Sequence, residues 1–125
     1  MRTILIVDDF LNSRKVVESM ILTEFAKNKP YQIIEAKNGK EALEKFNVQK
    51  IHLVITDLNM PEMDGIELTK AVRASTDYNA IPIILITTEK DQEKIKMAYT
   101  AGVTAVLRKP FNLQNLTILL EKVLH

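Results

Sequence analysis

Residues 51–57 read IHLVITD, an apolar run that stops at an aspartate. Residues 3–9 read TILIVDD, which has the same form and ends in two aspartates. Strands of a parallel sheet are buried on both faces, so they carry continuous apolar runs rather than alternating ones. The two stretches therefore predict parallel strands at 3–7 and 51–56, each followed directly by acidic side chains.

Three further strands are expected from the rest of the chain. Residues 81–87 and 103–107 are rich in Ile, Val and Leu, and residues 31–36 form a weaker run of the same kind. The segments between the runs have apolar residues at helical spacing, most regularly at Leu116, Leu119, Leu120 and Val123. Such spacing predicts amphipathic helices that pack one face on the sheet.

Helix starts are marked by capping residues. Asn38 precedes Glu41, and Asp64 precedes Glu67, by the three positions that separate an N-cap from N3. Asn112 is the expected cap of the last helix. Five strand–helix units then follow one another, which predicts a single α/β domain over residues 1–125 with a doubly wound parallel sheet.

Composition limits the classes of function. The 125 residues are 46% hydrophobic and 26% charged, as in an ordinary globular domain, and the formal net charge of +1 gives no electrostatic case for nucleic-acid binding. There is no cysteine, so disulfides and thiolate metal sites are excluded. No apolar run has the roughly 20 residues needed to span a bilayer. Without a signal-peptide layout, we expect a cytoplasmic protein.

Chemistry-bearing residues gather where the predicted strands end. Asp8 and Asp9 follow the first strand, Asp57 the third, Thr87 ends the fourth and Lys109 follows the fifth. These positions share one edge of a parallel sheet, where open α/β sheets bind ligands. Carboxylates about 4 Å apart repel by roughly 4 kcal/mol at an effective dielectric of 20. Such a cluster needs a hard cation, for which Mg²⁺ is the natural choice.

Each of these residues has a plainer interpretation when taken alone. An Asp-Asp pair can stand in a solvated loop or cap a helix, and Thr87 can cap the helix that follows it. A single lysine is most often a surface residue. The functional interpretation rests on all of them falling at the same edge of one sheet.

Three segments give the chain a specific resemblance. ILIVDD at 4–9, VITDLNMPEMDG at 54–65 and KPF at 109–111 resemble the motifs of response-regulator receiver domains over essentially the whole length. The resemblance implies a flavodoxin-like (βα)5 fold with strand order 2-1-3-4-5. It also implies a two-component signalling protein, with chemotaxis as a possible process.

The resemblance assigns a role to each residue of the cluster. Asp57 would be the phosphoacceptor. Asp9 and Asp57 would ligate Mg²⁺ directly, Asp8 would act through a water, and Asn59 would offer its backbone carbonyl. The phosphate itself would be held by two side chains, Thr87 and Lys109.

Other implied properties concern geometry and partners. The Lys109–Pro110 bond would be cis. A histidine kinase or histidine phosphotransfer protein would donate the phosphoryl group, small donors would also serve, and the chain would dephosphorylate itself. A downstream protein would read the face made by the fourth helix, fifth strand and fifth helix. We expect a monomer, with dimerisation on phosphorylation as an alternative.

The chain departs from the family at two positions. Val106 stands where receivers usually carry the aromatic ring that swings inward, so we expect readout by movement of residues 87–90 instead. Thr88 stands where Ala or Gly is common. Its β-branched side chain would narrow access to the acyl phosphate and lengthen its life, or it would merely start the fourth helix.

Two other functions compete with a stand-alone receiver. The chain could be the receiver of a larger response regulator or hybrid kinase, although Met1 and a last helix at the end of the chain favour a separate protein. It could also be a Mg²⁺-dependent phosphohydrolase with an aspartyl-phosphate intermediate. Those enzymes tend to use a second Asp two residues after the nucleophile, where this chain has Asn59, which cannot act as an acid and base.

Overall fold

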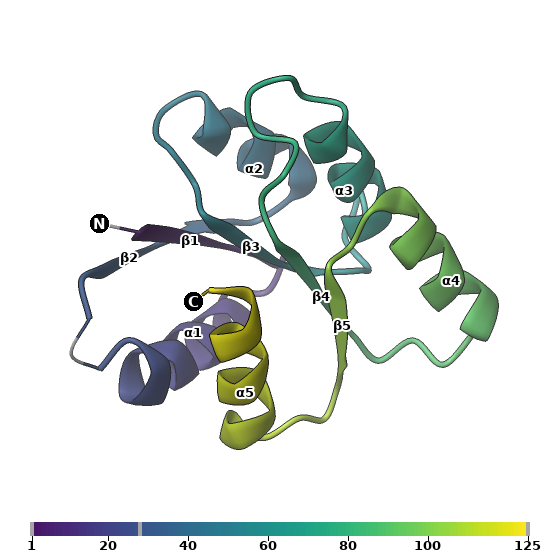
Figure 1. Ribbon diagram of the computed structural model, residues 1–125. Coiled ribbons are helices and arrows are strands. Elements are labelled where there is room, and N and C mark those ends of the chain that lie inside the picture. The colour runs from purple at the N-terminus through teal and green to yellow at the C-terminus, as the bar shows by residue number, and fades with distance from the viewer. Residues whose placement is uncertain (1, 28, 125) are drawn as a thin grey trace.

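The computed structural model describes residues 2–27 and 29–124, and strands and helices alternate along them as the sequence predicts (Figure 1). The five strands are β1 (Arg2–Val7), β2 (Tyr31–Ala36), β3 (Leu53–Asp57), β4 (Ile83–Thr87) and β5 (Ala105–Arg108). The helices are α1 (Leu11–Met20), which continues as the π-helix η1 (Ile21–Phe25), α2 (Gly39–Phe46), α3 (Gly65–Arg73), α4 (Gln92–Ala101) and α5 (Leu113–Val123). Among the described residues, no helix is both long and apolar enough to cross a membrane.

All neighbouring strands are parallel, and their order in the sheet is β2-β1-β3-β4-β5. This confirms the predicted flavodoxin-like fold. The chain moves outward from β1 to β2, returns to β3 beside β1, and then continues in the other direction. The carboxyl ends of β1 and β3 therefore flank the point where strand order reverses, the place where such sheets bind ligands.

The core has two layers because strand side chains alternate between the faces of the sheet. Leu5 and Val7 point to the face covered by α2, α3 and α4, whereas Ile4 and Ile6 point to the face covered by α1 and α5 (Figure 1). All four side chains are buried, as are most residues of β3 and β4. The central strands are thus covered on both faces, which is why they read as continuous apolar runs.

The predicted caps are confirmed. The side chains of Asn38 and Asp64 accept hydrogen bonds from the backbone N–H groups of Glu41 and Glu67. Asn112 caps α5 in the same way, through the N–H of the third helical residue. Each bond satisfies a backbone donor that the first helical turn leaves unpaired.

The predicted starts of three strands are wrong by two residues. The apolar runs at 51–56, 81–87 and 103–107 begin with buried or half-buried residues, but β3, β4 and β5 begin at 53, 83 and 105. Apolar character marks burial, whereas a strand also needs ladder hydrogen bonds. Pro82 has no N–H to contribute to the ladder, so β4 starts only after it.

Candidate functional site

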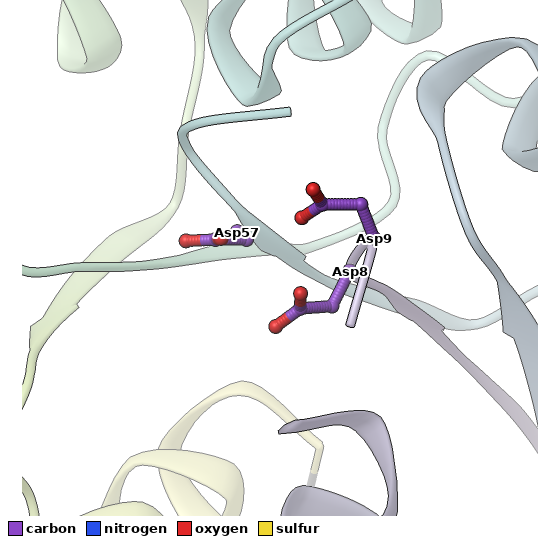
Figure 2. A group of neighbouring side chains, drawn as sticks. All are labelled: Asp8, Asp9 and Asp57. Atoms are coloured by element: carbon purple, nitrogen blue, oxygen red, sulfur yellow. The ribbon is translucent and has the colours of Figure 1, made fainter. Parts of the chain in front are cut away.

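Three carboxylates lie together at the carboxyl edge of the sheet. Asp8 and Asp9 come directly after β1, and Asp57 is the last residue of β3, its neighbour in the sheet. One carboxylate oxygen from each residue lies within 4.8 Å of the other two. Figure 2 shows the three side chains extending toward the same side, beyond the ends of these strands. The structure therefore brings together the acidic residues that the sequence placed at this edge.

Burial makes this cluster electrostatically unfavourable as it stands. Loss of solvation raises the pKa of Asp57 and of Asp8 above the usual range, although the charge of Lys109 opposes the rise at both residues. Oδ1 of Asp9 is buried and has no hydrogen-bond partner among residues 2–27 and 29–124. Buried carboxylate oxygens are normally paired, so an oxygen without a partner here fits a site that receives a cation.

Lys109 supplies the positive charge that the sequence predicts. Its Nζ lies 3.9 Å from Oδ1 of Asp57. The chain at the end of β5 is tied to β4, since the backbone N–H of Lys109 donates to the carbonyl of Thr87 over 2.9 Å. The Lys109–Pro110 peptide bond is cis, as the family resemblance implied. An ammonium group therefore faces the carboxylate of Asp57 from the β5 side.

Thr87 is fully buried at the end of β4, but its hydroxyl faces its own loop. Oγ1 accepts a hydrogen bond of 2.9 Å from the backbone N–H of Glu89. The helix α4 begins only at Gln92, with Asp91 as its cap, so the alternative in which Thr87 or Thr88 starts that helix is wrong. In this conformation the Thr87 hydroxyl closes a turn beside the carboxylates.

The loop after β3 begins at Leu58 and contains Asn59, two residues after Asp57. Leu58 donates its N–H to Oδ1 of Asp57 over 2.9 Å and accepts from the N–H of Gly65 over 2.8 Å. A Cβ at Gly65 would lie 2.5 Å from the carbonyl oxygen of Asp57. Only glycine therefore lets α3 begin this close to the strand end. The Asn59 side chain is exposed, two residues beyond Asp57.

Two features of the site were not found from the sequence. A groove of about 420 Å³ runs from Asp57 and Lys109 between α1 and the loop before α5, with apolar lining that includes Met20 and Phe111. Its walls come from distant parts of the chain, so no local pattern reveals it. The second feature is a pair of contacts made by Arg14 of α1, whose guanidinium donates to the Asp8 carbonyl and to Glu35 of β2.

Comparison with known proteins agrees with this geometry. Residues 4–121 match the response regulator receiver domain family. The chain belongs to the receiver domain family. Among curated relatives, this receiver is 38% identical over 122 residues to the chemotaxis protein CheY1 of Helicobacter pylori strain J99, covering 97% of this chain and 95% of that protein.

Solved structures extend the comparison. Chemotaxis protein CheY4 of Vibrio cholerae superposes with a TM-score of 0.87 at 36% identity, covering 99% of both chains. The response regulator TrrA of Thermotoga maritima, solved with Mg²⁺ and BeF, gives a TM-score of 0.83 at 31% identity and covers 99% of this receiver and 100% of that chain. This receiver is therefore a CheY-like response-regulator domain of two-component signalling.

Proposed function

We propose that this receiver is a phosphorylatable switch and that Asp57 accepts the phosphoryl group. The observation that carries the proposal is the convergence of three carboxylates and one ammonium on a single edge of the sheet, with Lys109 Nζ 3.9 Å from Asp57. Phosphoryl transfer depends mainly on positioning and on neutralising charge, which is what such a cluster can supply once a cation joins it.

The residues present fit Mg²⁺. Asp8, Asp9 and Asp57, with the backbone carbonyl of Asn59, would provide only oxygen ligands. Within the part of the chain that the structure describes, the buried Asp9 Oδ1 has no hydrogen-bond partner. When bound, Mg²⁺ supplies charge neutralisation for the phosphoryl oxygens. Mg²⁺ in the Thermotoga maritima TrrA structure supports this assignment by similarity.

The groups around Asp57 would orient its carboxylate and bind the phosphoryl oxygens. The N–H of Leu58 holds the Asp57 carboxylate in one orientation. An Asp57 oxygen forms a bond to phosphorus while the P–N bond to the histidine of a kinase or phosphotransfer protein breaks, and the imidazole nitrogen keeps that electron pair. Lys109 pairs with the phosphoryl oxygens as charge develops on them, and Thr87 donates its hydroxyl hydrogen to one of them.

Acetyl phosphate or another small donor would serve in the same way, with cleavage of its P–O bond. Water later attacks phosphorus and releases Asp57, so the phosphorylated state has a finite life. The protein is thus a phosphoacceptor with self-phosphorylation and autodephosphorylation rather than a turnover enzyme. Asn59, which cannot transfer protons in the way a carboxylic acid does, argues against general phosphohydrolase activity.

Readout would begin at Thr87. When its hydroxyl turns to the phosphate, Glu89 loses the contact that closes the 87–90 turn, and α4 follows directly after that turn. We propose that the α4–β5–α5 face then presents a changed surface to a downstream protein. Beryllofluoride should perturb backbone NMR signals of residues 87–90; unchanged signals there would contradict this route. Binding partners can be compared by pull-down with beryllofluoride-loaded protein and the Asp57→Ala variant.

The central test is labelling of Asp57. With radiolabelled acetyl phosphate or a phosphorylated histidine kinase, the protein should label in the presence of Mg²⁺ and lose the label on chelation. Asp57→Asn should remove at least about 99% of labelling, because the nucleophilic oxygen is lost. Asp77→Asn, an exposed aspartate away from the cluster, is the matched control and should label normally. Full Mg²⁺-dependent labelling of Asp57→Asn would overturn the assignment.

A further inference from the structure

The loop that carries Asp8 and Asp9 is held from several directions. The backbone N–H of Asp8 donates to the carbonyl of Ala36 at the end of β2 over 3.1 Å. Its side chain accepts from the N–H of Phe10 over 3.0 Å. The shortest contact comes from α1, where Nη1 of Arg14 donates to the Asp8 carbonyl oxygen over 2.7 Å. A charged donor at that distance is among the stronger hydrogen bonds in proteins.

Arg14 is itself anchored to β2. Its Nε donates to Oε1 of Glu35 over 2.9 Å, and the two side chains are only 14% and 24% exposed. The other carboxylate oxygen of Glu35 accepts from Nζ of Lys15 over 2.7 Å. One planar guanidinium therefore spans two fixed acceptors, a strand carboxylate and the carbonyl of a loop residue. A lysine has no such fork, since its donors share one nitrogen.

We propose that Arg14 is a positioning residue for Mg²⁺, which braces the Asp8–Asp9 loop against β2 so that both carboxylates face the cation. The inference rests on the proposed function of this site, because it names a residue that supports the same metal ligands. Residues that hydrogen-bond to metal ligands and orient them typically lower metal affinity by 10- to 100-fold when they are removed. Arg14 acts through the Asp8 backbone, and we expect an effect at the lower end of that range.

The charge of Arg14 and its proposed positioning role predict opposite changes in the Kd for Mg²⁺ when Arg14 is removed. Arg14 is a cation near a cation site, so its charge alone repels Mg²⁺, and its removal would tighten Mg²⁺ binding. As a brace it holds the ligands in place, and its removal would weaken Mg²⁺ binding. The direction of the change in Kd therefore separates the two roles.

The chain offers a matched pair of variants for this measurement. Arg14→Met and Lys15→Met each remove one positive charge and one hydrogen bond to Glu35, but only Arg14 contacts Asp8. We expect Arg14→Met to raise the Kd for Mg²⁺ by roughly tenfold. Lys15→Met should leave the Kd unchanged or lower it slightly. Isothermal titration calorimetry with MgCl₂ on the full chain gives both values.

Arg14→Lys provides a second route to the same decision. It keeps the charge and removes the fork, so a purely electrostatic role predicts a wild-type Kd, whereas positioning predicts a Kd roughly threefold higher, between wild type and Arg14→Met. Circular dichroism and thermal unfolding establish that each variant is folded. If Arg14→Met does not fold, the comparison of Arg14→Lys with wild type decides the proposal.

A metal-free measurement isolates the brace itself. The Phe10 N–H donates to the Asp8 side chain, so amide hydrogen exchange at Phe10 should accelerate in Arg14→Met and Arg14→Lys but not in Lys15→Met. Wild-type or tighter Mg²⁺ binding by a folded Arg14 variant would overturn the positioning role while leaving the proposed function intact. A wild-type protein that neither binds Mg²⁺ nor labels on Asp57 would overturn the proposed function itself.

Discussion

Two regions of the sheet, the carboxyl ends of the central strands β1 and β3 and the edge strand β5, differ in how deeply their residues are buried. At the carboxyl ends of β1 and β3, Asp8 is buried and Gly65 leaves no room for a Cβ beside the Asp57 backbone. At the other side, β5 is an edge strand whose described residues are half-buried or exposed, including Val106. The proposed phosphorylation site thus lies on buried central strands, whereas the surface that we propose to change on phosphorylation includes a more exposed edge strand.

The largest difference between the two regions should appear when a methyl group is added to a glycine in each. In Gly65→Ala the new Cβ meets the Asp57 carbonyl oxygen, which cannot move without distorting β3. We expect a loss of about 3 kcal/mol in the free energy of unfolding. Urea denaturation with a constant m-value measures it.

Gly102, at the end of α4, is the counterpart near β5. Its φ of +115° is unfavourable for other residues, and a Cβ there would lie 2.8 Å from Cγ of Arg73, whose guanidinium donates hydrogen bonds to the carbonyls of Gly102 and Ile81. A side chain can still shift more easily than the strand backbone beside Gly65. Gly102→Ala should therefore cost about 1 to 2 kcal/mol. A larger loss for Gly102→Ala than for Gly65→Ala would break the comparison.

The next effect concerns the buried carboxylate of Asp57 at the end of β3. Burial raises the pKa of Asp57, so without metal the folded protein binds a proton more readily there than the unfolded chain does. At neutral pH the ionised Asp57 carboxylate therefore lowers the free energy of unfolding. This destabilisation decreases as the pH falls through the raised pKa of Asp57. Asp57→Asn should increase metal-free stability at pH 7 by about 1 kcal/mol and flatten its pH dependence.

Thermal unfolding in EDTA between pH 4 and pH 8 measures this effect. The gain should disappear when Mg²⁺ is added, because the cation binds the folded wild type and stabilises it by an amount that grows with the logarithm of its concentration above Kd. Asp77→Asn is again the control, with no gain expected. A loss of metal-free stability in Asp57→Asn would show that the cluster is not under electrostatic strain.

A smaller, kinetic effect lies at the turn between the two regions. Thr88 is exposed beside the buried Thr87. We expect its side chain to shield the acyl phosphate that we propose at Asp57. Thr88→Ala should raise the rate of dephosphorylation about threefold, which corresponds to roughly 0.7 kcal/mol. Loss of label after removal of the donor gives the rate, and Thr88→Val, which keeps the branched shape, should leave it unchanged.

The smallest expected effect is at the edge strand β5. The hydroxyl of Tyr99 on α4 accepts a hydrogen bond of 3.2 Å from the backbone N–H of Val106. The tyrosine is half exposed, so Tyr99→Phe should change the free energy of unfolding by less than about 0.5 kcal/mol. Amide exchange at Val106 should nevertheless accelerate. Unchanged exchange would show that this contact does not protect the β5 edge.

The sequence predicted the elements better than their limits or their order. Alternating apolar runs and helical stripes identified five strands and five helices, because buried positions are apolar and follow the geometry of each element along the sequence. They could not locate the start of β4 after Pro82, where burial continues but ladder pairing does not. The strand order came from the family resemblance, since apolar runs do not say which strands are neighbours.

The continuation of α1 into a π-helix was also missed. Ala26 donates its N–H to the carbonyl of Ile21, five residues back, and the hydroxyl of Thr23 donates to the carbonyl of Ser19. The apolar stripe on this segment fits an α-helix and a π-turn almost equally well. Local periodicity therefore cannot separate the two.

By itself, the sequence determined which residues could form a site, because strand ends are readable from hydrophobicity and the acidic, hydroxyl and basic residues stand directly at them. Only the tertiary structure decided how that site is supported. Arg14 and Glu35 are 21 positions apart and meet solely because β2 pairs with β1 beside α1. Such contacts depend on the packing of side chains across elements, and that information is not local to any stretch of the chain.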